Sequence, residues 1–328
     1  MTKTRIISLA VIVLSVVAIV WSLGGGMFRE RGFDFTIEGA MTAGEVPDTT
    51  GWGVADLKID TVGGRYRIAG HAVRPCVVEV GTDEVTYCST LFIERGEIVV
   101  EEWRATGTSA NDARTAMLSA TDSLAWSCPE GEYSDAYERG YDSLARAYIE
   151  VNRANLYGGW LAERLSQKLP IDEARELFEG LSSGVRRMEA VAPLRERVER
   201  YDRSQEGRRV NALPSEVVSA LDEGRYVLID FWASWNVNES VRADKLRTLT
   251  DQFEASELTI CRISMDNSCE QWQSTIEGDP MEWIQLRGES CELAIESLPI
   301  SYLVSPKGVI VACAESIDEL KQALEELF

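Results

Sequence analysis

Seven cysteines are the residues of this chain best suited to covalent chemistry. A thiolate can attack a disulfide, and two neighbouring thiols can store electrons as a disulfide bond. An odd number of cysteines leaves at least one thiol unpaired within the chain. The seven are Cys76, Cys88, Cys128, Cys261, Cys269, Cys291 and Cys313.

A single histidine, His71, restricts most other chemistry. A histidine-based zinc site or a Ser-His-Asp triad would depend on this one residue, which stands in a Gly-His-Ala stretch typical of a strand. No phosphate-binding loop, dinucleotide motif or metal-ligand spacing occurs. We therefore expect no metal and no cofactor.

The composition indicates a globular, acidic protein. The 328 residues include 33 Lys+Arg and 54 Asp+Glu, which gives a formal net charge of −21. Such a chain has no basic surplus to displace counterions from phosphates, so we expect no nucleic-acid partner. At roughly 150 residues per domain, the length predicts about two domains.

Residues 1–28 carry a targeting signal. The stretch Ile6–Leu23 is apolar, without charge, and follows Lys3 and Arg5. It is long enough to span a membrane as an anchor, and it also fits a signal peptide cleaved at the small residues near Gly24. Both alternatives predict export, where disulfides are tolerated.

Residues 33–108 read as a small antiparallel β domain, because short alternating stretches are separated by Gly, Asp and Pro. Cys76 and Cys88 flank a turn around Gly81-Thr82-Asp83. If Val80 pairs with Glu84, the two cysteines face each other and a disulfide can form. The alternative is two free thiols facing the core.

The remainder predicts a helical connector over 109–205 and an α/β domain over 206–328. The nearly continuous apolar run Tyr226–Trp235 is typical of a strand buried on both faces of a parallel sheet. A second such strand, a hairpin and a closing helix follow, so the order is βαβ and then ββα.

Three segments of the last block resemble the TlpA/ResA-like branch of the thioredoxin family. YVLIDFWASW (226–235) resembles the strand that leads into the active site, and LTICRISMD (258–266) resembles the next strand. LPISYLVSPKGVIVA (298–312) resembles the cis-proline loop and terminal hairpin, with Pro299 at the cis position. The resemblance implies a thioredoxin-like domain with a central mixed sheet flanked by helices, exported to the periplasmic side of a bacterial cell envelope.

Upstream segments extend this resemblance over nearly the whole exported chain. FTIEG (35–39), LFIERGEIVVE (91–101) and GTSAND (107–112) are similar to the small β domain of unknown function that precedes such thioredoxin domains. The segment 148–169 is similar to the helical linker of those proteins.

The residues that carry the family's activity are absent. The positions of its Cys-x-x-Cys motif read Asn236-Val-Asn-Glu239. Neither side chain can attack or resolve a disulfide, so the dithiol cycle cannot run at this site. Asp230 occupies the position of the family's buried acid. Glu239 either lies near Asp230, where one of the two pKa values rises, or turns to solvent in the first helical turn.

The resemblance also implies a groove for an extended peptide. Trp235 and Pro299 keep its shape, and the backbone of Leu298 is the group that pairs with such a peptide in the family. Trp232 is expected in the core. We therefore predict a redox-inactive binding or scaffolding module with an unknown peptide or protein partner, held at the membrane if the leader is uncleaved.

Two alternatives remain open. Cys269 follows the predicted strand end at Asp266, and Cys291 shortly precedes Pro299, so the two could form a relocated redox pair, a structural disulfide or no bond. The first case would make the chain a thiol-disulfide oxidoreductase. In the second alternative the small β domain carries the function of the protein, and the thioredoxin-like domain only caps it.

Overall fold

The computed structural model describes residues 32–40, 49, 52–82, 85–102, 104–128, 133–277, 283–288 and 291–328. The leader expected over 1–28 lies outside these residues. The chain divides into two compact units, each treated separately below: Met1–Leu165 with Leu177–Ala192, and Ser166–Glu176 with Pro193–Phe328. The predicted helical connector is shared between both units.

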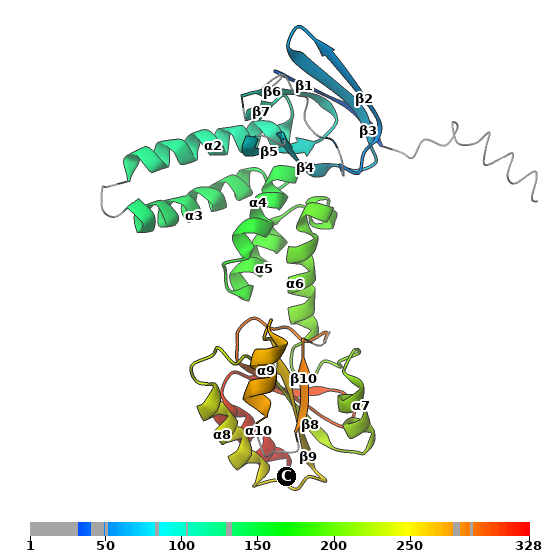
Figure 1. The fold of residues 1–328 in the computed structure, drawn as a ribbon, viewed down its shortest axis with the longest axis vertical. Coiled ribbons are helices and arrows are strands. Elements are labelled where there is room, and N and C mark those ends of the chain that lie inside the picture. Colours follow the sequence, from blue (N-terminus) through cyan, green and yellow to red (C-terminus); the bar gives the residue numbers. More distant parts are fainter. Residues whose placement is uncertain are drawn as a thin grey trace, which may run out of the picture. The chain divides into compact units, whose positions relative to one another are not determined.

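The described residues of the first unit form seven strands in two sheets (Figure 1). The larger sheet has the order β2-β3-β1-β6-β7, and β4 pairs with β5 alone. The prediction of a purely antiparallel domain is wrong, because β1 runs parallel to β6. The strands are β1 (Phe33–Ala40), β2 (Ala55–Val62), β3 (Arg65–Ala72), β4 (Cys76–Thr82), β5 (Val85–Ile93), β6 (Gly96–Glu101) and β7 (Arg104–Thr106).

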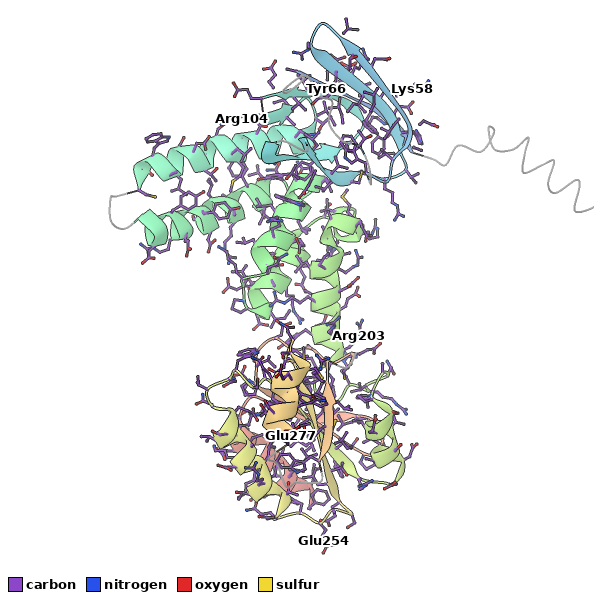
Figure 2. The ribbon with its side chains drawn as sticks, in the orientation of Figure 1. Lys58, Tyr66, Arg104, Arg203, Glu254 and Glu277 are labelled. Atoms are coloured by element: carbon purple, nitrogen blue, oxygen red, sulfur yellow. The ribbon has the colours of Figure 1, made fainter. Side chains whose placement is uncertain are left out.

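Alternation along these strands separates a core face from a solvent face. Phe35 and Ile37 of β1 are buried among apolar side chains of the neighbouring strands. Tyr66 of β3 is buried as well, whereas Lys58 on the edge strand β2 is exposed (Figure 2). The period of two in a strand accounts for this pattern.

Helices follow the β domain. The helices α2 and α3 form an antiparallel hairpin (Figure 1), and they approach closely at Gly140, where a Cβ atom would lie 2.6 Å from a methyl group of Leu124. No helix within the described residues is long and apolar enough to cross a membrane. The helices are α2 (Ser109–Ser127), α3 (Tyr133–Val151), α4 (Leu156–Ser166), α5 (Ile171–Gly180) and α6 (Ala192–Arg203), with 3-10 turns at Val185–Arg187 and Glu189–Val191.

The second unit has a mixed five-stranded sheet in the order β10-β9-β8-β11-β12. The strands β8, β9 and β10 are parallel, and β11 and β12 run antiparallel to them. This arrangement confirms the predicted thioredoxin-like domain. Its elements are α7 (Ser215–Asp222), β8 (Tyr226–Trp232), α8 (Glu239–Thr250), β9 (Leu258–Ser264), α9 (Cys269–Ile276), β10 (Ile284–Arg287), β11 (Ile300–Val304), β12 (Ile310–Ala314) and α10 (Ile317–Leu327).

Helices cover both faces of this sheet. Leu246 of α8 and Leu320 of α10 pack with Leu228 on one face, and Val217 of α7 packs with Ile229 on the other. Because side chains alternate along β8, Asp230 belongs to the face covered by α8 and α10. A charged residue in the centre of this sheet is the first indication of a site.

Candidate functional site

The loop that precedes α8 faces the segment that precedes β11. The Leu298–Pro299 peptide bond is cis, as the sequence predicts. Trp232 at the end of β8 is fully buried, whereas Trp235 in the following loop is 65% exposed. Trp232 is therefore a core residue, whereas the indole of Trp235 is open to solvent.

Asn236, the first residue of the Asn236-Val-Asn-Glu239 stretch, links these two segments. Its amide Nδ2 donates to the backbone oxygen of Leu298 at 3.1 Å. Its Oδ1 accepts from the backbone N–H of Asn238 at 3.0 Å. The side chain thus joins the loop to the segment that precedes β11.

Glu239, at the second motif position, points into the protein. It is 8% exposed, and its Oε1 accepts a hydrogen bond of 2.5 Å from Nη2 of Arg262. The alternative in which Glu239 turns to solvent is wrong. The sequence around Glu239 does not indicate this orientation, because the buried partner lies on a different element, β9.

Asp230 is fully buried and held from three sides. Nε of Arg242 donates to Oδ1 at 2.8 Å, and Nε of Arg262 donates to Oδ2 at 3.0 Å. The hydroxyl of Ser301 donates to Oδ1 at 2.7 Å. The strand register explains the contacts, since Arg262 on β9 and Ser301 on β11 lie directly opposite Asp230.

The four charged side chains form what we call the buried ion network: Asp230, Glu239, Arg242 and Arg262. Its two carboxylates and two guanidinium groups balance. The guanidinium carbon of Arg262 also lies 4.4 Å from the centre of the Trp232 ring and 5.6 Å from that of Trp283. The network is therefore neutral overall and enclosed by aromatic rings.

The surroundings of the network shift the pKa of one of its members, Glu239. Burial raises the pKa of Glu239 above its usual value, and nearby Asp230 raises it further, while Arg262 and Arg242 oppose the shift. Both carboxyl groups are occupied by arginine. The expectation that Asp230 has a structural role fits these contacts, because its two oxygens accept from Arg242 and Arg262.

Sequence reasoning missed Arg242 and Arg262, the two arginines that form the ion pairs with Asp230 and Glu239. Arg262 had a recognisable signal, because it is the one charged residue of the strand LTICRIS (258–264), which is buried on both faces. Arg242 had none, since arginine is common on exposed helix faces.

A cavity of about 580 Å³ opens beside this network; we call it the Trp235 cavity. Residues of the loop, of α8, of β9 and of α9 line it. They are Ser234, Trp235, Asn236, Val237, Glu239, Ser240, Ala243, Asp244, Arg247, Arg262 and Thr275. The predicted groove residue Trp235 and both motif positions therefore border one hollow.

The structure does not bring Cys269 and Cys291 together, and both are free thiols. Cys269 is exposed at the start of α9, whereas the Cys291 thiol donates to the backbone oxygen of Ala212 at 3.8 Å. Burial also raises the pKa of Cys291, which disfavours its nucleophilic thiolate. The relocated disulfide is not formed.

The predicted pairing of Cys76 with Cys88 across the β4–β5 hairpin is also wrong, because the register of the two strands differs from the expected one. Val80 pairs with Ser89, and Cys76 lies opposite Ile93. Cys76 is a free thiol, and burial raises its pKa. The side chain of Cys88 lies outside the described residues.

The remaining candidate residues form no metal site. No group of His, Cys, Asp and Glu side chains within the described ranges could hold a metal ion. His71 is buried in β3, and its Nδ1 lies 2.9 Å from Oδ1 of Asp34. This contact accounts for the histidine without catalysis.

Comparisons with known proteins complete the description of the site. No protein-family model and no curated protein matches the chain. Among solved structures, a thiol-disulfide oxidoreductase from Bacteroides fragilis is 29% identical with a TM-score of 0.29, and the match covers 32% of this chain and 82% of that one.

Two further structures give the same result. The C-terminal domain of a putative thiol-disulfide oxidoreductase from Bacteroides thetaiotaomicron is 25% identical with a TM-score of 0.33, covering 38% of this chain and 96% of that one. A thioredoxin-like protein from Bacteroides caccae is 13% identical with a TM-score of 0.38, covering 60% and 84%. Part of the chain is thus similar in structure to thioredoxin domains of thiol-disulfide oxidoreductases.

Proposed function

We propose that this chain is an exported protein of the bacterial cell envelope whose thioredoxin-like domain binds a peptide or protein segment without thiol–disulfide chemistry at the start of α8. One observation carries the proposal: Asn236 and Glu239 are held in fixed polar contacts where the resemblance places two cysteines, beside the exposed Trp235. The fold of a redox domain is kept while its reacting atoms are replaced.

Exposed apolar side chains next to the Trp235 cavity favour a binding function. The indole of Trp235 is exposed, and Val237, which lines the same cavity, is 91% exposed. Exposed apolar side chains grouped next to a cavity are typical of an interaction surface. The cis-proline loop borders the same surface through the bond from Asn236 to Leu298.

The absence of redox activity is tested with insulin reduction by dithiothreitol. We expect the purified chain to leave the rate at the level of dithiothreitol alone. An acceleration would overturn this part of the proposal. In that event, Cys269→Ser and Cys291→Ser would identify the reacting thiol, because these two residues are the predicted alternative.

Binding and location are tested together by photo-crosslinking in a bacterial envelope. A photoreactive amino acid replaces Trp235 in the full chain, and the same replacement of Trp126, which is 90% exposed on α2, serves as the control. We expect an adduct at position 235 that is absent at position 126, in the fraction exported from the cytoplasm. Equal labelling at both positions, or recovery in the cytoplasm, contradicts the proposal.

A further inference from the structure

We propose that the partner of this groove is a basic extended segment, in which arginine or lysine side chains lie next to apolar ones. The inference rests on the proposed function and names the chemistry of the partner. It is carried by two cavities that border the cis-proline loop.

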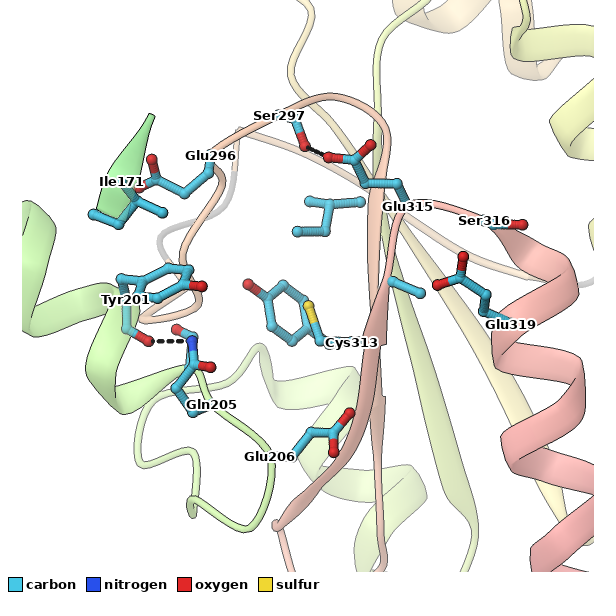
Figure 3. A pocket seen from close by; sticks show the side chains of 14 residues that line it. Ile171, Tyr201, Gln205, Glu206, Glu296, Ser297, Cys313, Glu315, Ser316 and Glu319 are labelled. Atoms are coloured by element: carbon cyan, nitrogen blue, oxygen red, sulfur yellow. Dashed lines mark hydrogen bonds between the residues drawn. The ribbon is translucent and has the colours of Figure 1, made fainter. Parts of the chain in front are cut away.

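The first is a cavity of about 790 Å³, which we call the acidic cavity (Figure 3). Four glutamates line it, and no lysine or arginine is among its lining residues. Its apolar and aromatic wall includes Tyr302 and Ile300. The glutamates are Glu206, Glu296, Glu315 and Glu319.

Two of these glutamates already have partners. Glu296 is paired with Arg197, whose Nη2 lies 2.5 Å from Oε2, and Glu315 accepts from the hydroxyl of Ser297. Glu206 and Glu319 are exposed and form no ion pair with another described residue. Cys313 in the same wall stays a neutral thiol, because burial and then the nearby Glu206 and Glu315 raise its pKa. The cavity therefore keeps a negative charge that a ligand cation can balance.

The second observation lies in the Trp235 cavity. Oε1 of Glu239 is bound to Arg262, but Oε2 is buried and has no hydrogen-bond partner among the described residues, and the side chain is 10% exposed. A buried oxygen without a partner is costly, so a donor supplied by a ligand in this cavity is favoured. The exposed indole of Trp235 accepts either an apolar side chain or a cation on its face.

Both cavities border one loop. Ser297 and Ile300 line the acidic cavity, while Leu298 between them is bonded to Asn236 of the Trp235 cavity. Successive side chains of an extended segment point to opposite sides, so one segment lying on the loop can reach both hollows. The chain's net charge of −21 attracts a basic segment and repels an acidic one.

The test uses the full chain in mild detergent on an array of random hexapeptides. We expect the bound peptides to be enriched in arginine or lysine next to aliphatic residues. The tightest arginine peptide and its citrulline analogue, which keeps the shape and loses the charge, are then compared by calorimetry. The analogue should bind about fivefold more weakly, and the difference should shrink as salt is added.

Substitutions test which acidic residues cause the preference for the arginine peptide. The double substitution Glu206→Gln with Glu319→Gln should remove most of the arginine preference, whereas Glu326→Gln, on the same helix but outside the cavity, should keep it. Trp235→Ala should weaken both peptides alike. Equal affinity for the arginine peptide and its analogue overturns the basic partner and leaves peptide binding intact. Binding of no peptide overturns both proposals, and an unchanged preference in the double variant overturns the acidic cavity as its source.

Discussion

The two five-stranded sheets among the described residues bury different kinds of polar group. The five-stranded sheet of the first unit has an apolar core, and the polar side chains buried in that unit include Asn111 and His71. The sheet of the second unit buries Asp230, Glu239, Arg242 and Arg262. The first sheet therefore needs local hydrogen bonds, whereas the second needs a balance of charge across three elements.

Asn111 shows how the first arrangement works. Its Nδ2 donates to the backbone oxygen of Phe92 at 2.7 Å, and its Oδ1 accepts from the backbone N–H of the same residue at 3.2 Å. The amide replaces a missing strand neighbour and joins α2 to β5. In the ion network, by contrast, each member forms its ion pairs with other members, so the loss of one leaves an unbalanced charge.

The largest expected effect is that of Asp230→Ala. It leaves two buried arginines with one carboxylate between them, and breaking a buried ion pair costs about 3–5 kcal/mol. We expect the free energy of unfolding in urea to fall by that amount, with an unchanged slope against denaturant. A loss below about 1 kcal/mol would show that water already reaches the network and would remove the contrast between the sheets.

A smaller effect is expected for Asn111→Ala in the first unit. The substitution leaves the N–H and the carbonyl of Phe92 without this partner, which costs about 1–3 kcal/mol. Ser123→Ala, on the exposed part of the same helix, is the control and should stay within about 0.5 kcal/mol. If Asn111→Ala lowers the free energy of unfolding as much as Asp230→Ala does, neutral and charged buried groups contribute equally to the stability of this protein.

The pH dependence of Glu239→Gln sharpens the comparison. Burial raises the pKa of Glu239 in the folded protein above the usual 4.5, so the folded state holds this proton more tightly than the unfolded state. The stabilisation from that proton is complete below the unfolded pKa and is lost as the pH rises through the folded pKa. Urea unfolding of both proteins between about pH 4 and 7 should show the wild type losing stability relative to Glu239→Gln as the pH rises. A relative gain would mean that the bond to Arg262 outweighs burial.

The smallest effect belongs to Asp318→Ala. Asp318 is 70% exposed in its side chain and lies 2.5 Å from Nζ of Lys245. Such a surface pair contributes about 0–1 kcal/mol, because water screens it. The same urea titration, repeated at high salt, should show no further difference between this variant and the wild type.

Sequence reasoning succeeded where the pattern is local. The apolar run of β8 was predicted as a strand buried on both faces, and the cis bond at Pro299 came from a motif that carries its own geometry. Each of these conclusions depends on adjacent residues.

The predictions failed where the partner is distant in sequence. The register of the β4–β5 hairpin depends on an irregularity between Val80 and Thr82, and a shift of register leaves the alternating pattern unchanged. The inward orientation of Glu239 depends on Arg262, which arrives with a strand beyond α8. Pairings of this kind leave no periodic signal in either segment.

The place of β1 in its sheet has a consequence for the time course of folding. This first strand lies between β3 and β6, and Phe35 pairs with Gly96. The sheet cannot close until β6 has been synthesised, and such long-range pairings form slowly because a large loop must be ordered first. The helices α2 and α3 rely on local contacts and can form early. Chain segments that pair late stay open to intermolecular pairing for longer, so the N-terminal sheet is where assistance during folding would matter most.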